Sequence, residues 1–220
     1  MRAPKTASTL AAALLELSEL TPLEKITVSD LSERCGISRK TFYYYFSGIP
    51  SLITWIFRRD LAALLEEEFD EGKLVYESQG LTAKSPTGSF PCYIRVKSGI
   101  RMLDHSRFFV LFAKALEDRK RFYQAAFRQC DAQYFSQYFF DLYQPELKKD
   151  IGVMLDGRHL NPASVEFLSE FYARAFTQDM IQRVMLGSPL SPSMAAERMG
   201  NHIHEAIYRE LEGRRFSERR

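Results

Sequence analysis

Cysteine, histidine and net charge are all scarce in this chain of 220 residues. Its three cysteines, Cys35, Cys92 and Cys130, lie far apart and form no Cys-x-x-Cys pair, which argues against a structural zinc site or a disulfide framework. Of the four histidines, His202 and His204 are close neighbours, but residues two apart on a helix point in nearly opposite directions. We therefore expect neither a bound metal nor a cofactor.

Long apolar runs are missing as well. No stretch approaches the ~18–20 consecutive apolar residues that a membrane-spanning helix needs. The segment from Leu10 to Leu15 resembles the apolar part of a signal peptide, but Glu16 and Glu19 interrupt it and no small-residue cleavage site follows. These features, together with the few cysteines, predict a cytoplasmic protein that has no membrane partner.

The sequence also lacks the local motifs of common enzyme classes. It contains no Gly-x-Gly-x-x-Gly or Walker loop, no Gly-x-Ser-x-Gly elbow and no His-Glu-x-x-His motif. No convergent set of acid, base and nucleophile is recognisable. An all-helical enzyme is therefore the least favoured interpretation, and we predict that the protein is not an enzyme.

The net charge of +2 does not by itself indicate a polyanionic partner. The positive surplus lies within the first 60 residues, and Lys and Arg balance Asp and Glu in the remainder. This position agrees with nucleic-acid binding at the N-terminus, although two charges do not establish it.

Apolar residues recur at helical spacing through most of the chain, and no segment alternates as a half-buried strand does. Leu10, Leu14, Leu17 and Leu20 predict a first helix over residues 6–20, which ends before Pro22. Residues 72–91 contain Gly and Pro among Ser and Thr, which predicts a loop. We expect an all-α protein without a sheet, with further helices at residues 50–69, 92–104, 107–116, 119–143, 162–187 and 191–212.

Residues 27–46 have the pattern of two short helices joined by a turn. Thr27 and Asp30 have the spacing of a capping box, which starts a helix. Gly36 ends that helix, because glycine adopts the left-handed C-terminal conformation without steric cost. Ser38 is placed to cap a second helix over residues 39–46. This arrangement predicts a helix-turn-helix, whose second helix enters the DNA major groove.

The second helix carries suitable chemistry for DNA. Arg39, Lys40 and Thr41 place hydrogen-bond donors at its N-terminal end. Ile37 and Phe42 are expected to hold it to its scaffold, with Phe46 behind. Three consecutive tyrosines remain, whose hydroxyls can bind phosphates and whose rings can contact thymine methyls. We expect one of these rings to be substantially buried. Capped helix pairs also occur in proteins that never bind DNA, but the cationic and aromatic surface favours DNA.

The run from Thr27 to Phe46 resembles the DNA-binding signature of the tetracycline-repressor (TetR) family, and the resemblance covers most of residues 6–60. The Tyr-Tyr-Tyr-Phe stretch and residues 52–57 are similar to the branch that contains regulators of dihydroxyacetone kinase. One departure is Ile49, where many members have a lysine that grips a phosphate, which puts that contact in doubt. The resemblance implies DNA-contacting roles for Thr27, Ser29, Ser38, Arg39, Lys40, Thr41, Tyr43, Tyr44 and Tyr45.

The resemblance also implies the domain organisation: a helix-turn-helix domain at residues 1–50, a helical regulatory and dimerisation domain at 51–213, and a polar tail at 214–220. A long helix joins the two domains. Residues 108–143 contain twelve aromatic side chains, which predicts a bulky core with an aromatic-walled ligand pocket as the functional alternative. The candidate pocket residues are Arg101, His105, Phe109, Phe112, Phe127, Tyr134, Tyr138 and Phe176.

The helix at 162–187 has more apolar positions than one core-facing stripe requires, and the helix at 191–212 carries an apolar stripe of its own. An intramolecular core could bury this surplus, but a second copy of the chain is the simpler explanation. We therefore predict a homodimer that pairs through these helices and binds a palindromic double-stranded DNA operator. The predicted function is that of a transcriptional regulator, in particular a repressor released by an unknown small-molecule effector. The alternative is a helical adaptor with a degenerate DNA-binding module that acts through protein contacts.

Overall fold

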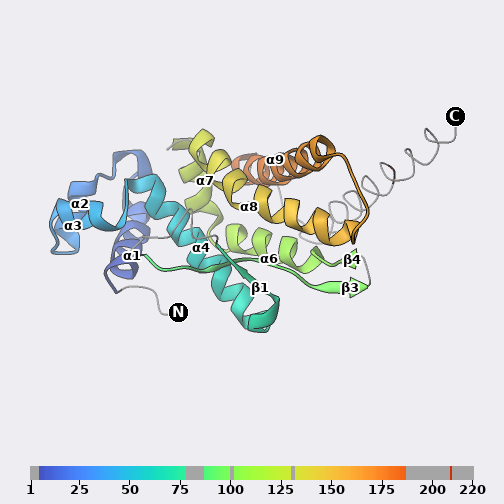
Figure 1. The fold of residues 1–220 in the computed structure, drawn as a ribbon. Coiled ribbons are helices and arrows are strands. Elements are labelled where there is room, and N and C mark those ends of the chain that lie inside the picture. The colour runs from blue at the N-terminus through green and yellow to red at the C-terminus, as the bar shows by residue number, and fades with distance from the viewer. Residues whose placement is uncertain (1–4, 78–86, 100–101, 130–131, 187–208, 210–220) are drawn as a thin grey trace, which may run out of the picture.

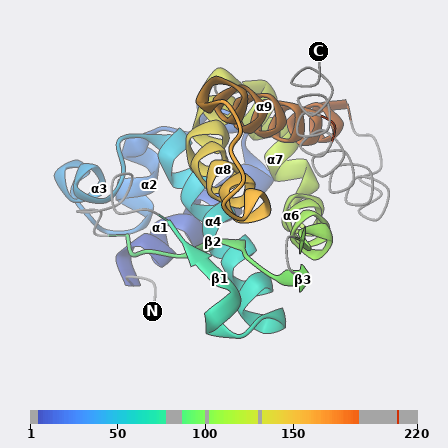
Figure 2. The same ribbon diagram turned by 45° about the vertical axis from the view of Figure 1, so that its right-hand side comes forward.

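The computed structural model describes residues 5–77, 87–99, 102–129, 132–186 and 209. Helices make up most of these residues, which confirms the predicted architecture. Three N-terminal helices lie at one end of an elongated molecule, and a long helix leads from them into a body of further helices, as Figure 1 and Figure 2 show. No helix of the described ranges combines the length and the apolar character that crossing a membrane requires.

The three helices at this end form the N-terminal unit, which comprises α1 (Lys5–Leu20), α2 (Val28–Arg34) and α3 (Arg39–Tyr45). Leu10 and Leu14 of α1 are fully buried, as the spacing of the leucines predicts. Leu31 of α2 and Phe42 of α3 fill the same core. A single 3-10 turn, η1 (Leu23–Lys25), follows Pro22 and leads into α2. Each short helix is therefore held by one or two apolar anchors.

The long connecting helix is α4 (Ile49–Glu68). Its first half packs beneath the N-terminal unit, where the ring of Trp55 lies 6.0 Å from that of Phe46. Its middle enters the body, where Phe57 contacts Phe112 at a ring distance of 4.9 Å. α4 therefore contributes side chains to the cores of both parts.

In the part of the body that the structure describes, four helices follow: α6 (Ser106–Glu117), α7 (Lys120–Gln129), α8 (Ala132–Leu155) and α9 (Pro162–Leu186). α8 and α9 lie side by side in both views (Figure 1, Figure 2). Between these helices and α4 lies an aromatic core in which the rings meet mostly edge to face, a favoured geometry. Its fully buried members include Phe57, Tyr93, Phe108, Phe112, Tyr123, Phe127, Phe135, Phe139 and Tyr143.

Two small antiparallel sheets replace the helix predicted over residues 92–104, and the expectation of no sheet was also wrong. The strands are β1 (Leu74–Tyr76) with β2 (Pro91–Ile94), and β3 (Lys97–Gly99) with β4 (Met102–Leu103). All four residues of β2 are buried, and both α4 and α8 contact this strand. A strand that is covered on both faces shows no alternation of apolar and polar residues, so the signal used to detect strands is missing from its sequence.

The helix predicted over residues 119–143 is divided between α7 and α8, and α8 continues beyond Pro145 to Leu155. The proline removes one backbone N–H, but its side chain is exposed and does not disturb the packing. Glu146 and Asp150, in the next turns, are buried and accept hydrogen bonds from Arg95 at 3.0 and 2.7 Å. Beyond Pro145, α8 is therefore in contact with distant segments, through these ion pairs and through Leu147 and Ile151, which belong to a buried apolar cluster with Ala173 of α9.

Two tyrosines of the aromatic core differ in how their hydroxyls are satisfied. Tyr93 donates a hydrogen bond to Asp150 at 2.9 Å, whereas the buried Tyr143 hydroxyl has no partner among the described residues. Burying an unsatisfied hydroxyl costs free energy. Tyr143→Phe is therefore expected to raise the free energy of unfolding by about 1 kcal/mol, and Tyr93→Phe to lower it by about 2 kcal/mol. Denaturant titrations of the two variants test this, and a loss of stability in Tyr143→Phe would contradict it.

α9 corresponds to the helix predicted over residues 162–187 and buries one side against the body through Ala173, Phe176 and Met180. Phe167 and Phe171 lie on its outer side, 63% and 53% exposed, and their rings stack at 5.8 Å. The second helix of the predicted interface, residues 191–212, and the polar tail at 214–220 lie outside the described residues, except for residue 209.

Candidate nucleic-acid interface

α2 begins with the capping box that its sequence predicts. The Thr27 hydroxyl accepts a hydrogen bond from the backbone N–H of Asp30 at 3.2 Å, and the Asp30 carboxylate accepts from the Thr27 N–H at 2.7 Å. The backbone hydrogen bond from Thr27, followed by the one from its hydroxyl, lowers the pKa of Asp30. The cap fixes where α2 starts and leaves Thr27 on the surface.

The turn between α2 and α3 is a Schellman motif centred on Gly36. This residue has φ +62°, and the N–H groups of Gly36 and Ile37 donate to the carbonyls of Glu33 and Ser32 at 3.1 and 2.9 Å. A Cβ at Gly36 would meet no atom within 4 Å, so glycine is required here by the backbone conformation and not by crowding. Ile37 then packs against the core and sets the direction in which α3 leaves the turn.

α3 is capped at its start and anchored along one side. The Ser38 hydroxyl accepts from the backbone N–H of Thr41 at 3.0 Å, as predicted. Phe42 is fully buried and Phe46, which follows the helix, is almost fully buried. The two rings lie 5.9 Å apart and fix α3 to α4 and to the rest of the N-terminal unit. A helix of seven residues is too short to be stable alone, so these anchors determine its position.

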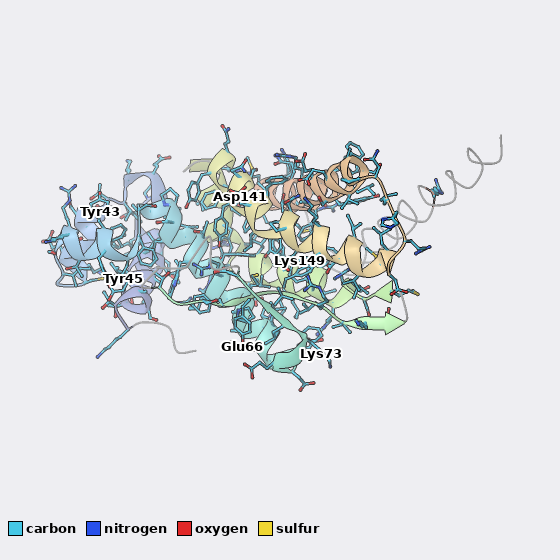
Figure 3. All side chains as sticks on the ribbon, viewed as in Figure 1. Tyr43, Tyr45, Glu66, Lys73, Asp141 and Lys149 are labelled. Carbon is cyan, nitrogen blue, oxygen red and sulfur yellow. The ribbon has the colours of Figure 1, made fainter. Side chains whose placement is uncertain are left out.

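The opposite side of α3 and the start of α2 form one exposed polar surface, which we call the α3 surface. It contains six of the nine residues predicted to contact DNA and carries the exposed rings of Tyr43 and Tyr44, at 51% and 67%. Figure 3 shows Tyr43 at the end of the molecule. Arg39 and Lys40 form no ion pair with the described residues, so both cations are available. Its members are Thr27, Ser29, Arg39, Lys40, Tyr43 and Tyr44. Ser38 is also exposed and was also predicted to contact DNA, but its hydroxyl caps α3.

The remaining two residues predicted to contact DNA, Thr41 and Tyr45, are less exposed than the members of the α3 surface. Thr41 is partly buried, and its hydroxyl lies 2.9 Å from that of Ser38. Tyr45 is also partly buried and packs against the core, with its ring on the side of α3 that faces away from Tyr43 (Figure 3). Of the three tyrosines, Tyr45 is thus the most buried, although it is only partly buried and not enclosed.

The start of α4 differs from the family pattern at the position noted in the sequence. Ile49 and Pro50 occupy the first helical turn and are both partly buried. The Ser51 hydroxyl accepts from the Gly48 N–H at 3.2 Å and donates to the Gly48 carbonyl at 2.8 Å. The turn is therefore closed by its own residues, and no side-chain cation at position 49 extends from it.

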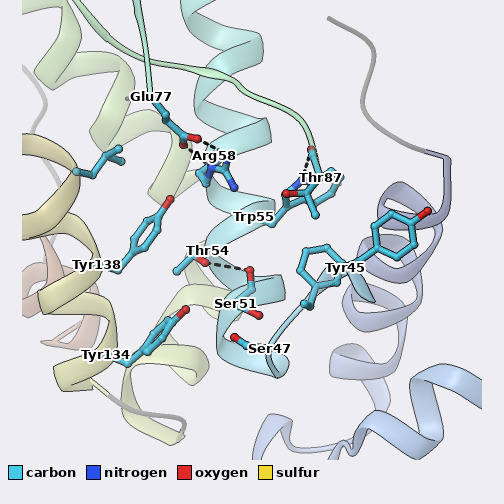
Figure 4. A pocket seen from close by; sticks show the side chains of 12 residues that line it. Tyr45, Ser47, Ser51, Thr54, Trp55, Arg58, Glu77, Thr87, Tyr134 and Tyr138 are labelled. Carbon is cyan, nitrogen blue, oxygen red and sulfur yellow. Dashed lines mark hydrogen bonds and ion pairs between the residues drawn. The ribbon is translucent and has the colours of Figure 1, made fainter. Parts of the chain in front are cut away.

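A pocket of about 300 Å³ lies between the end of α3, the first half of α4 and the side of α8, and we call it the junction pocket (Figure 4). Seven of its side chains carry hydroxyl groups, and one buried ion pair joins α4 to the segment after β1. Its lining residues are Tyr45, Phe46, Ser47, Ser51, Thr54, Trp55, Arg58, Glu77, Thr87, Tyr134, Tyr138 and Leu142.

The junction pocket contains only Tyr134 and Tyr138 of the eight predicted pocket residues. Phe112 and Phe127 are enclosed in the aromatic core. Phe109 and Phe176 border a crevice of about 10 Å³, and His105 borders a separate crevice of the same size, which is room for about one water molecule. The His105 Nε2 atom lies 2.9 Å from Asp150, and Arg101 is outside the described residues. The structure does not bring the other seven residues into one site.

Sequence reasoning missed the polar wall of the junction pocket. Arg58 donates two hydrogen bonds to Glu77 through Nε and Nη2, and Nη2 also reaches the Gly88 carbonyl at 3.3 Å. Burial raises the pKa of Glu77, and the nearby Arg58 opposes that effect. The sequence did contain one signal for this ion pair, namely Arg58 in the apolar stretch of α4. A charged side chain that is buried requires a partner of opposite charge. The partner of Arg58 lies 19 residues away, at a distance that no helical spacing indicates.

Comparisons with known proteins agree with this arrangement. A family model described as "Bacterial regulatory proteins, tetR family" matches residues 10–53, and one described as "Transcriptional regulator C-terminal region" matches residues 105–205. The HTH-type dhaKLM operon transcriptional activator DhaS of Lactococcus lactis subsp. lactis (strain IL1403) is 35% identical over 65 residues, which are 30% of this chain and 35% of that protein. This chain therefore matches about a third of the length of that relative.

Among solved structures, one described as "Dihydroxyacetone kinase operon activator DhaS" superposes with a TM-score of 0.58 at 21% identity. The match covers 93% of this chain and 97% of that structure. At this identity the likeness concerns the fold, which therefore extends over nearly the whole chain and beyond the N-terminal unit.

Proposed function

This chain belongs to the TetR family of transcriptional regulators, and we propose that it binds its DNA operator by inserting α3 into the major groove. The α3 surface is the observation that carries this proposal. It combines two cations that form no ion pair with the described residues and two exposed tyrosines, on a short helix that is fixed by a Schellman turn and an N-cap. Rigid presentation of donors is what sequence-specific binding requires.

We assign the contacts on the α3 surface according to their positions. Arg39 and Lys40 lie at the N-terminal end of α3, which enters the groove first, and can reach base edges or phosphates. Tyr43 and Thr27 are placed to bind phosphates, and Tyr44 adds an exposed ring one residue further along α3. Tyr45 is the weakest candidate for a DNA contact, because its ring borders the junction pocket.

We further propose that residues 1–50 act as the DNA-binding domain of a homodimer, with residues 51–213 as the regulatory and dimerisation domain. The exposed pair Phe167 and Phe171 on α9 supports an interface on that side. Two-fold symmetry places two α3 helices on one side of the DNA, about 34 Å apart, so the operator is palindromic.

The direction of control has two candidates. The sequence predicts a repressor that a ligand releases from the operator. Both relatives are named as operon activators, which favours activation as the second candidate. A reporter gene placed behind the operator separates the two, because deletion of the regulator raises expression under a repressor and lowers it under an activator.

A mobility-shift assay on the DNA upstream of the protein's own gene, across a salt series, tests DNA binding. We expect a specific complex whose affinity falls linearly with the logarithm of salt concentration, with a slope of about −0.9 for each phosphate contacted. Scrambled DNA of the same length is the control. If the protein binds no duplex at low ionic strength, the alternative function holds, namely a helical adaptor that acts through protein contacts. Ile49, in place of the phosphate-binding lysine of many family members, is the feature that favours this alternative.

A further inference from the structure

We infer that the junction pocket binds a small, uncharged ligand with carbonyl or hydroxyl oxygens, and that this ligand touches the end of the recognition helix α3 directly. The pocket measures about 300 Å³ and is formed by residues that belong to both parts of the molecule. Its regulatory consequence rests on the proposed function, whereas its occupancy does not.

The walls of the pocket explain why it lies at a sensitive point. Tyr45 ends α3, and Ser47 lies in the short link between α3 and α4. On the opposite side, Tyr138 and Leu142 extend from α8 of the body. Figure 4 shows the tyrosines of α8 pointing across the pocket toward α4. A ligand in this space would therefore contact the DNA-binding unit and the body at once.

Two donors at the pocket wall take part in no hydrogen bond within the described ranges. Among the described residues, no hydrogen bond engages the Tyr138 hydroxyl, and the bonds of Arg58 involve Nε and Nη2 but not Nη1. Burial holds the pKa of Tyr138 well above its usual range, so the phenol keeps its proton and can donate it to an acceptor. An oxygen atom of a ligand placed between Arg58 and Tyr138 would accept hydrogen bonds from both.

The charge of the wall selects against an ionic ligand. Glu77 already neutralises Arg58 through a two-pronged ion pair, and both side chains are buried. A carboxylate or phosphate would be repelled by Glu77, and an ammonium group by Arg58. The rest of the wall carries hydroxyl groups and apolar side chains, among them Trp55, Phe46 and Leu142. An uncharged molecule with one or more oxygen acceptors fits this lining.

The volume limits the size of the ligand. A volume of 300 Å³ corresponds to that of about ten water molecules in the liquid. A ligand of roughly that number of non-hydrogen atoms therefore fits, and a ligand of this size is expected to bind with a Kd in the millimolar range. Occupation would press on Tyr45 and Ser47 and change the angle at which α3 leaves the N-terminal unit, and with it the affinity for the operator.

The single tryptophan of the chain makes the pocket directly measurable. Trp55 lines it, and its indole Nε1 donates to the Thr87 carbonyl at 3.1 Å. We propose to titrate the full-length protein with cyclohexanone and cyclohexanol, and with cyclohexanecarboxylate as the charged analogue, while recording Trp55 fluorescence. Saturable change is expected with the ketone and the alcohol, and none with the carboxylate.

The variant Tyr138→Phe removes one hydroxyl and is expected to weaken ketone binding about tenfold, as loss of one buried hydrogen bond does. Tyr123→Phe is the matched control, because its buried hydroxyl lies outside the pocket and has no partner among the described residues; it should bind the ketone as the parent protein does. Circular dichroism verifies that both variants are folded.

Three results would overturn the inference: fluorescence that neither the ketone nor the alcohol changes, equal binding of the carboxylate, or equal affinity of Tyr138→Phe. DNA binding is measured separately, by repeating the mobility shift with and without saturating cyclohexanone. Saturable fluorescence without any DNA complex would refute the proposed function and leave the pocket intact. A DNA complex without fluorescence change would refute the pocket alone.

Discussion

Lys40→Ala is expected to weaken operator binding about tenfold and to reduce the salt slope by about one, because one phosphate or base-edge contact is lost. The Lys40 side chain is exposed at the start of α3 and forms no ion pair with the described residues, so the substitution removes charge without breaking a structural contact. Fluorescence anisotropy with labelled operator DNA, at several salt concentrations, measures both quantities.

Tyr43→Phe tests the same surface without changing its charge. Loss of the hydroxyl is expected to weaken binding about five- to tenfold, which corresponds to one hydrogen bond to a phosphate, and to leave the salt slope unchanged. The ring of Tyr43 stays in contact with Phe42, whose centroid is 5.5 Å away, so α3 keeps its packing.

The controls are the same substitutions at exposed positions away from α3. Lys97→Ala changes β3, which lies at the far end of the body in Figure 1, and Tyr76→Phe changes β1. Neither should alter operator affinity. Full affinity in both Lys40→Ala and Tyr43→Phe would show that the DNA surface lies elsewhere.

Phe171→Arg is expected to convert a dimer into a monomer. The ring is 53% exposed and stacks on Phe167, and a guanidinium in an apolar interface would be buried without a partner. Size-exclusion chromatography with light scattering measures the mass directly. In a dimer, binding of one subunit to its half-site holds the other subunit close to the second half-site. A monomer lacks this advantage and should bind the full operator about 10²- to 10⁴-fold more weakly.

Met102→Arg is the matched control for this variant. Met102 is another exposed apolar side chain, at 55%, but it lies on β4 and not on α9. It should leave both the mass and the operator affinity unchanged. A Phe171→Arg protein that remains dimeric would move the interface away from this side of α9.

Much of the N-terminal unit could be predicted because its determinants are local. The capping box of Thr27 and Asp30, the left-handed Gly36 and the cap at Ser38 each act within a few residues. Both partners of each interaction lie close together in the sequence, so their spacing alone indicates the interaction that forms in the folded protein. The boundaries of α2 and α3 therefore agree with the prediction to within one residue.

The body was less predictable because its structure depends on distant partners. β2 exists because β1 pairs with it and α4 and α8 cover it, so its sequence has the even hydrophobicity that is equally compatible with a helix. Beyond Pro145, α8 packs its apolar side against α9, and Arg95 binds the buried carboxylates of Glu146 and Asp150. Neither partner lies within helical spacing of the segment that it stabilises.

The same distinction applies to the two candidate sites. By itself the sequence determined the helix-turn-helix and the chemistry of α3, because caps, a glycine turn and a short amphipathic helix are set by neighbouring residues. Only the tertiary structure decided where the pocket lies, because its donors come from α4 and α8 and its charge balance depends on Glu77 beyond β1. Aromatic residues fill a core or line a pocket according to how the helices pack, and that packing depends on the whole chain.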